Sequence, residues 1–187
     1  KICKKYNIPT ANFRILENLK DTKKFLVSAK YPLVIKADGL AGGKGVYICK
    51  SYDEAVIASN EIFGGKFGGP QNLLVEEFLS GEEMSYFVIC DGKSYKFIGS
   101  AQDHKRVGEG DKGKNTGGMG CYSPSRLFSV ELAKKINSQI VDPALKAIKD
   151  LGSSYKGFLY VGLMIQNSDP YLVEFNVRMG DPECQTI

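Results

Sequence analysis

The stretch Leu172-Val173-Glu174-Phe175-Asn176-Val177-Arg178 has the alternating pattern of a β-strand, with polar side chains at even-numbered positions. Because successive side chains of a strand point to opposite faces, Glu174, Asn176 and Arg178 are expected to share one face. Carboxylate and amide oxygens suit Mg²⁺, which usually keeps substrate phosphates in its shell, and arginine forks match phosphate oxygens. The stretch therefore indicates phosphoryl chemistry; the alternative is the polar outer face of an edge strand.

The size and charge of the chain limit the classes of protein it can belong to. Its 187 residues are 43% hydrophobic, which is enough for a real core in one or two domains. The formal net charge is only +4, with 25 basic and 21 acidic residues. This balance favours small anionic substrates and gives little support to a nucleic-acid partner.

The cysteines and the apolar runs bear on where the protein works. Five cysteines, an odd number without C-x-x-C spacing, suggest neither a disulfide framework nor a zinc site, so we expect a reducing, cytoplasmic environment. No apolar run reaches membrane-spanning length, and the first residues do not resemble a signal peptide. The chain begins without Met and ends just after a charged cluster, so we expect it to be a piece of a longer polypeptide.

A glycine-rich loop lies between two predicted strands at 31–36 and 46–49. It reads Asp38-Gly39-Leu40-Ala41-Gly42-Gly43-Lys44-Gly45. It lacks the spacing of a P-loop, and a strand rather than a helix follows it. The exposed N–H groups of such a hairpin tip can fold over phosphates, with Lys36 and Lys44 as cations. The loop is therefore predicted to be a lid, or else an ordinary mobile hairpin tip.

The remaining pattern favours an α+β architecture over a doubly wound parallel sheet. Ser51 and Glu54 form a capping-box signature for a helix that ends at Gly64-Gly65, and Ser129 caps a helix that runs to Asp150 with a kink at Pro143. Further strands are predicted at 72–78, 84–90, 94–100, 157–165 and 171–176, with a hairpin turn at Asp91-Gly92 and a polar loop at 103–123.

The run from Val75 to Ser85 reads as two extended segments joined by a turn at Gly81. Such a run can serve as a nucleotide hinge, in which backbone groups of Glu76, Glu77, Phe78 and Leu79 meet the adenine edge. A carboxylate past the turn would then accept the ribose hydroxyls. The alternative is that these acidic residues are ordinary surface charges.

Five motifs occur in one order along essentially the whole chain. They are the Lys36–Val46 loop, the Glu76–Ser85 run, Gln102-Asp103-His104-Lys105-Arg106, Asn115-Thr116-Gly117-Gly118-Met119-Gly120, and Glu174-Phe175-Asn176 with Gly180-Asp181-Pro182-Glu183. Together they resemble the phosphoribosylamine-glycine ligase family, whose members have an ATP-grasp fold and act in purine biosynthesis. The glycine lid and E-x-N are shared with other ATP-grasp enzymes, whereas Q-D-H-K-R followed by N-T-G-G-M-G and G-D-P-E narrows the choice to this family.

The resemblance implies a fold of two α+β subdomains that grip ATP between them. Residues 1–75 would form the small subdomain with the lid, and residues 76–187 the large subdomain with the metal and substrate site. The N- and C-terminal domains of the parent enzyme would be absent. In the implied reaction, ATP phosphorylates the glycine carboxylate, and the amine of 5-phosphoribosylamine attacks the acyl phosphate to give glycinamide ribonucleotide, ADP and phosphate.

The resemblance also implies roles for individual residues. The residues that contact ATP would be Lys36, Gly39, Gly42, Gly43, Lys44 and Gly45 at the phosphates, Glu76, Glu77, Phe78 and Leu79 at adenine, and Glu83 at the ribose. Glu174 and Asn176 would hold Mg²⁺ or Mn²⁺.

Other residues are candidates for catalysis and for substrate binding. Arg178 and Lys36 are the candidate catalytic residues, because their positive charges can stabilise the charge on the transferring phosphoryl group. The candidate substrate contacts are Asn115, Thr116, Gly117, Gly118 and Met119, which would cradle the phosphoribosyl phosphate, and Asp181 and Glu183, which would receive an amine. The alternative for Asp181-Pro182 is that it forms a turn that simply ends the strand and has no part in substrate binding. His104 is expected to be structural or substrate-orienting rather than a general base.

The chain departs from the family pattern in two places. The strand at 157–166 contains no carboxylate, so metal ligation is expected to depend on the nucleotide. Gly42 stands where Ala is common, which raises the entropic cost of ordering the lid by up to about 1 kcal/mol. Two alternatives stay open: another ATP-grasp carboxylate-amine ligase or carboxylase, and a nucleotide-binding module without turnover.

Overall fold

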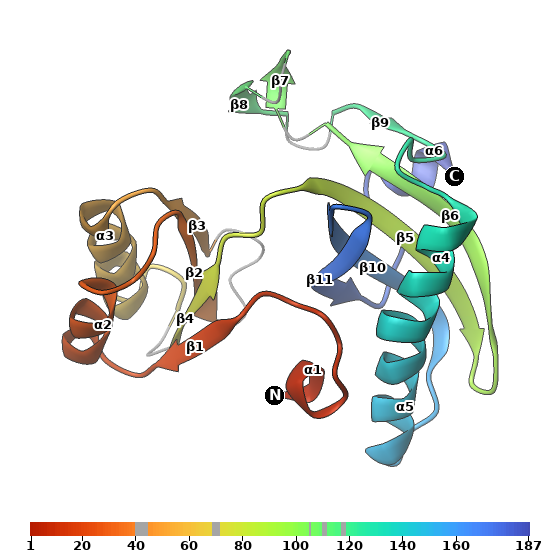
Figure 1. Ribbon diagram of the computed structural model, residues 1–187, viewed down its shortest axis with the longest axis horizontal. Helices are drawn as coiled ribbons and strands as arrows, with labels where there is room; N and C mark the ends of the chain where they lie inside the picture. The colour runs from red at the N-terminus through yellow and green to blue at the C-terminus, as the bar shows by residue number, and fades with distance from the viewer. Residues whose placement is uncertain (40–44, 69–71, 105, 110–111, 117–118) are drawn as a thin grey trace. The chain divides into compact units, whose positions relative to one another are not determined.

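The computed structural model describes residues 1–39, 45–68, 72–104, 106–109, 112–116 and 119–187, with Arg106, Lys112 and Asn115 described by their backbone alone. The chain forms two compact units (Figure 1). The smaller unit is Ala11–Leu79, and the larger unit combines Lys1–Thr10 with Ser80–Ile187. The ladders that join the strands within each unit are antiparallel, which confirms the α+β prediction.

The smaller unit is a four-stranded sheet with two helices on one face. Its strands, in spatial order, are β1 (Phe13–Leu16), β4 (Asn72–Glu77), β2 (Leu33–Asp38) and β3 (Val46–Cys49), and its helices are α2 (Leu19–Leu26) and α3 (Tyr52–Phe63). Figure 1 shows the two helices side by side. The buried side chains Ile35, Leu73 and Val75 point to the helices, so the alternate side chains of the same strands lie on the open face.

The helix ends of this unit follow from local hydrogen bonds. The backbone N–H of Glu54 donates to Ser51 Oγ (3.3 Å), and the N–H of Lys50 donates to the Glu54 carboxylate (2.7 Å), so the predicted cap is confirmed. The strand β1 and the helix α2 were not predicted from the sequence. Asn18, whose side chain accepts from the N–H of Asp21 (2.9 Å), was the available signal for α2.

The larger unit is a five-stranded sheet whose long interrupted helix covers one face, while the C-terminal helix reaches Ser85 on the other face (Figure 1). Its strands, in spatial order, are β11 (Asp169–Asn176), β10 (Lys156–Gln166), β5 (Glu82–Asp91), β6 (Tyr95–Asp103) and β9 (Cys121–Tyr122). Its helices are α1 (Ile2–Lys5), α4 (Val130–Ile136), the π-helical turn η1 (Asn137–Val141), α5 (Asp142–Asp150) and α6 (Glu183–Thr186). The core includes Tyr86, Val88 and Val161 from the sheet and Ile136 and Ile140 from the helices.

The predicted long helix is present, and its irregularity has a clear cause. Ser129 caps it as expected, by accepting from the N–H of Leu132 (3.1 Å). The predicted kink appears as the π-helical turn Asn137–Val141, which lies directly before Pro143. Proline has no N–H to donate one turn back, and its ring crowds the carbonyl there, so the preceding turn widens.

The polar segment at 103–123 was predicted to be a loop, and this prediction is wrong in part. It contains the paired strands β7 (Arg106–Gly108) and β8 (Lys112–Asn115), and β9 pairs with the end of β6. Backbone pairing in such short glycine-rich strands needs no apolar alternation, so hydrophobic periodicity cannot reveal it.

Within the described ranges, no helix combines the length and the apolar character needed to cross a membrane.

Cys49 is 2% exposed, and burial raises the pKa of its thiol to about 11. We expect iodoacetamide to label Cys49 at least about a hundredfold more slowly in the native full-length protein than in guanidinium. In the native protein the fraction of thiolate is low and the sulfur is inaccessible to the reagent. The exposed Cys184 provides the internal reference in peptide mapping. Since the folded pKa lies above that of a free thiol, this group's contribution to stability is expected to be lost as pH rises from about 9 to about 11. Equal native labelling of the two cysteines would contradict the prediction.

Candidate active site

Lys36 and Glu76 form an ion pair on the open face of the smaller sheet. Lys36 Nζ lies 2.5 Å from Glu76 Oε2, and their side chains are 24% and 16% exposed. The two residues lie on adjacent strands, because Lys36 is opposite Leu74 and Glu76 is opposite Val34. Antiparallel pairing therefore brings a cation and a carboxylate together from positions 40 residues apart in the chain.

The open face around this pair is apolar. Cross-strand pairing aligns the residues of this face in two rows that run across the four strands. One row is Phe13, Glu76, Val34 and Ile48, and the next is Ile15, Leu74, Lys36 and Val46. Phe13, Ile15, Val46 and Ile48 are all exposed. Exposed apolar side chains around one lysine fit a ligand with a flat apolar part and an anionic part, as a nucleotide has.

Glu174 and Asn176 lie next to each other on the open face of the larger sheet. Asn176 Nδ2 donates to Glu174 Oε1 (3.0 Å). Glu174 is opposite Gly162 while Leu172 is opposite Leu163, so Val173 is an extra residue in a β-bulge. The bulge reverses the alternation: Leu172 and Phe175 pack in the core, and Glu174 and Asn176 point away from it.

This pair fits a hard divalent cation, because the donors it offers are carboxylate and amide oxygens. Across the described part of the chain, no group of three or more His, Cys, Asp or Glu side chains is arranged to hold a metal. Mg²⁺ is commonly bound by one or two carboxylates and takes its other ligands from water and substrate phosphates.

The segment after β11 carries three of the predicted residues. The strand ends at Asn176, and the exposed Arg178 donates from Nη1 to the carbonyl of Met179 (2.9 Å). Asp181 Oδ1 accepts from Gln185 Nε2 (3.0 Å). Glu183 differs from both, because it is only 5% exposed and its Oε1 accepts a hydrogen bond from Ser85 (2.7 Å).

The predicted hinge residues follow the last strand of the smaller unit. Glu77 ends β4, and its Oε2 accepts from Asn12 Nδ2 (2.8 Å). Phe78 is 38% exposed, and Leu79 follows it outside any helix or strand. Glu83 is an exposed residue of β5 in the larger unit.

The predicted glycine loops are described only in part. Gly39 is exposed, and the carbonyl of Gly45 accepts from the N–H of Ala37 (2.9 Å). The Thr116 hydroxyl donates to the carbonyl of His104 (2.5 Å), and Met119 is 78% exposed. The side chain of Asn115 and all of Gly42, Gly43, Lys44, Gly117 and Gly118 lie outside the described residues.

Sequence reasoning missed three residues on the sheet face that carries Glu174: Ser85, Tyr160 and Gly162. The ladder places Gly162 opposite both Glu174 and Ser85, and Tyr160 opposite Asn176. The signal was the alternation of Tyr160 and Gly162 with the buried apolar residues of β10.

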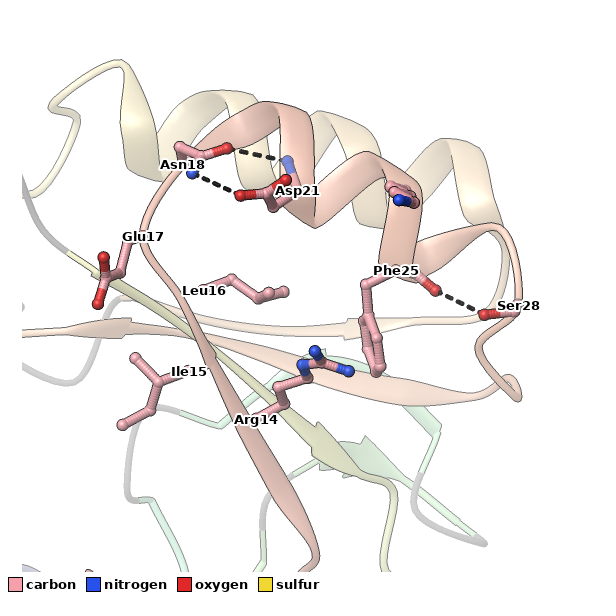
Figure 2. A pocket seen from close by; sticks show the side chains of 9 residues that line it. Arg14, Ile15, Leu16, Glu17, Asn18, Asp21, Phe25 and Ser28 are labelled. Atoms are coloured by element: carbon pink, nitrogen blue, oxygen red, sulfur yellow. Dashed lines mark hydrogen bonds between the residues drawn. The ribbon is translucent and has the colours of Figure 1, made fainter.

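A hollow of about 490 Å³ lies elsewhere in the smaller unit, between α2 and the edge strand β1 (Figure 2). Its lining includes Arg14, Asn18, Asp21, Lys24 and Phe25, and Arg14 lies over the Phe25 ring at 5.1 Å. None of the predicted site residues lines it.

The comparisons with known proteins bear on the family and the fold of the chain. Residues 1–184 match the family described as phosphoribosylglycinamide synthetase, ATP-grasp (A) domain. The phosphoribosylamine-glycine ligase of Mesorhizobium japonicum is 46% identical over 187 residues, which are 100% of this chain and 44% of that protein. The chain thus spans less than half the length of this relative.

Two solved structures have the same fold. The crystal structure of phosphoribosylamine-glycine ligase from Thermotoga maritima superposes with a TM-score of 0.88 at 40% identity, over 97% of this chain and 46% of that one. The crystal structure of carboxyaminoimidazole ribonucleotide synthase from Aspergillus clavatus, complexed with ATP, superposes with a TM-score of 0.70 at 21% identity. The match covers 96% of this chain and 43% of that one. The ATP-grasp fold expected from the sequence is confirmed, and the chain belongs to the phosphoribosylglycinamide synthetase ATP-grasp (A) domain family.

Proposed function

We propose that the protein containing this chain ligates glycine to 5-phosphoribosylamine at the expense of ATP. The reaction passes through a glycyl phosphate and yields glycinamide ribonucleotide, ADP and phosphate, as a cytoplasmic step of purine biosynthesis. The observation that carries the proposal is the Glu174–Asn176 oxygen pair on an open sheet face, in a chain 46% identical to phosphoribosylamine-glycine ligases. The partners are therefore small molecules, with no role for nucleic acid or membrane.

The proposed ATP contacts are assigned to each unit by itself. In the smaller unit, Lys36 and the apolar open face would take the nucleotide, Gly39, Gly42, Gly43, Lys44 and Gly45 would cover the phosphates, and the backbone of Glu76, Glu77, Phe78 and Leu79 would meet adenine. In the larger unit, Glu83 would accept the ribose hydroxyls, and Glu174 and Asn176 would hold Mg²⁺ or Mn²⁺. When bound, the metal supplies positive charge that neutralises the phosphate oxygens.

The chemistry then depends mainly on positioning and charge. Glycine carboxylate and ATP are both anionic, so Lys36 and Arg178 lower their repulsion and stabilise charge on the phosphoryl group. A lid over the phosphates excludes water, which would otherwise hydrolyse the acyl phosphate. Asp181 and Glu183 would receive a substrate amine. Asn115, Thr116, Gly117, Gly118 and Met119 would cradle the phosphoribosyl phosphate. No protein nucleophile is needed.

ADP release by the full-length protein tests this function directly. With glycine and 5-phosphoribosylamine, we expect Mg²⁺-dependent ADP release and an equal amount of glycinamide ribonucleotide. Replacing glycine with other carboxylates, or 5-phosphoribosylamine with other amines, should lower the rate by at least about tenfold. Equal rates with unrelated acids would indicate a different ATP-grasp ligase or a carboxylase. Metal-dependent ATP binding without ADP release would indicate a nucleotide-binding module.

A further inference from the structure

Gly162 leaves a space on the open face that two side chains share. A Cβ atom at Gly162 would lie 3.1 Å from Glu174 Cγ and 3.2 Å from Tyr160 Cε1. Both distances are shorter than ordinary carbon contacts, so the aliphatic stem of Glu174 and the edge of the Tyr160 ring lie closely over the glycine backbone. A side chain at position 162 would press on both groups, which would have to move by a few tenths of an ångström to admit it.

Glu174 has Asn176 as a hydrogen-bond partner and shares the space over Gly162 with Tyr160. Asn176 donates to its carboxylate, and its stem and the Tyr160 ring edge both lie close to the position that a Cβ of residue 162 would take. Tyr160 is also the direct cross-strand partner of Asn176. The two predicted metal ligands and one tyrosine thus form a compact group on β10 and β11.

Tyr160 is held in turn from β5. Its ring lies 5.1 Å from the ring of Phe87, centroid to centroid, at an interplanar angle of 60°, and Phe87 is fully buried. Its hydroxyl lies 3.3 Å from Ser85 Oγ. An aromatic pair and a hydrogen bond fix a tyrosine in one rotamer better than either does alone.

Ser85 is anchored by a buried carboxylate. Ser85 and Glu183 are 4% and 5% exposed, and the Ser85 hydroxyl donates to Glu183 Oε1 (2.7 Å). Since this serine has one proton and gives it to Glu183, its oxygen stays an acceptor for the Tyr160 hydroxyl. A buried carboxylate with such a partner costs free energy to displace, which makes the group rigid.

We propose that Tyr160 is a positioning residue that holds Glu174 in the orientation for metal binding, and that Glu183 and Ser85 hold Tyr160. This inference rests on the proposed function, because it takes Glu174 and Asn176 as the metal ligands. The ring limits the space over Gly162 that the Glu174 stem can occupy, and the hydroxyl steadies the ring. Residues that orient metal ligands affect metal affinity by about 10- to 100-fold.

Mn²⁺ binding in the presence of ATP, followed by the EPR signal of free Mn²⁺, tests the proposal on the full-length protein. Tyr160→Leu removes the ring edge and is expected to weaken Mn²⁺ binding at least about tenfold. Tyr160→Phe keeps the ring and should stay within about threefold of the unaltered protein. Gly162→Ala, which adds one methyl group in the space that the ring edge and the Glu174 stem share, should weaken binding as Tyr160→Leu does, and it tests the same space if the leucine variant does not fold.

Two controls separate positioning from general damage. Tyr155→Leu makes the same change at a partly buried tyrosine whose hydroxyl donates to the carbonyl of Phe158 (2.5 Å), and it should leave Mn²⁺ binding unchanged. ATP binding in EDTA should be unchanged in every variant. Unchanged Mn²⁺ binding in Tyr160→Leu and Gly162→Ala would overturn the inference, as would an equal loss of metal-free ATP binding. If the unaltered protein binds no Mn²⁺ with ATP, the proposed function itself fails.

Discussion

Replacing Glu174 with Gln is expected to lower kcat for ADP release by the full-length protein at least about a hundredfold at ordinary Mg²⁺ concentrations. The substitution keeps the size of the side chain and removes its negative charge. The amide has one oxygen where the carboxylate has two, and Glu174 Oε1 already accepts from Asn176. The variant therefore loses both the charge that attracts the cation and a ligand atom, while the sheet around it has no reason to change.

The control for this prediction is Glu131→Gln on α4. Glu131 is exposed and is not among the predicted site residues, so this variant should keep full activity. Asn176→Leu should give a loss of activity similar to that of Glu174→Gln, because it removes the other proposed ligand oxygen. Retained turnover of Glu174→Gln at ordinary Mg²⁺ would show that the metal ligands lie elsewhere.

Most of the fold could be predicted where local signals are strong. The Ser51 and Ser129 caps and the Asp91-Gly92 turn fix the ends of helices and strands through contacts within four residues. These contacts do not depend on the rest of the structure, so the sequence alone reveals them. The strand β1 gives no such signal: its four residues are a strand because they pair with β4, which lies about 60 residues further along the chain.

The candidate site shows the same limit. Glu174 and Asn176 were predicted from strand alternation, and they do lie together, but the bulge at Val173 means that simple alternation does not extend back to Leu172. Ser85 and Tyr160 could not be predicted as their neighbours, because strand order and register decide which residues are opposite each other. The same is true of the Lys36–Glu76 pair, which depends on the β2–β4 register.

Replacing Lys36 with Met is expected to lower kcat/KM for ATP by about 100- to 1,000-fold, chiefly through the loss of a cation at the phosphates. Methionine keeps most of the aliphatic stem, so the packing on the open face should change little. The substitution also leaves the carboxylate of Glu76, 16% exposed, without its cation. That loss alone should cost on the order of 1–3 kcal/mol of stability, which denaturant unfolding measures.

The double variant Lys36→Met/Glu76→Gln separates these two effects. Glu76→Gln removes the uncompensated charge, so the double variant should recover stability, while kcat/KM for ATP stays as low as in Lys36→Met. Lys24→Met, at an exposed lysine that lines the hollow between α2 and β1, serves as the matched control and should leave KM for ATP unchanged. Recovery of activity together with stability would mean that Lys36 serves only to balance Glu76. The contact between Lys36 and the ATP phosphates would then have to be abandoned, because a cation that binds phosphate cannot be replaced by neutralising its neighbour.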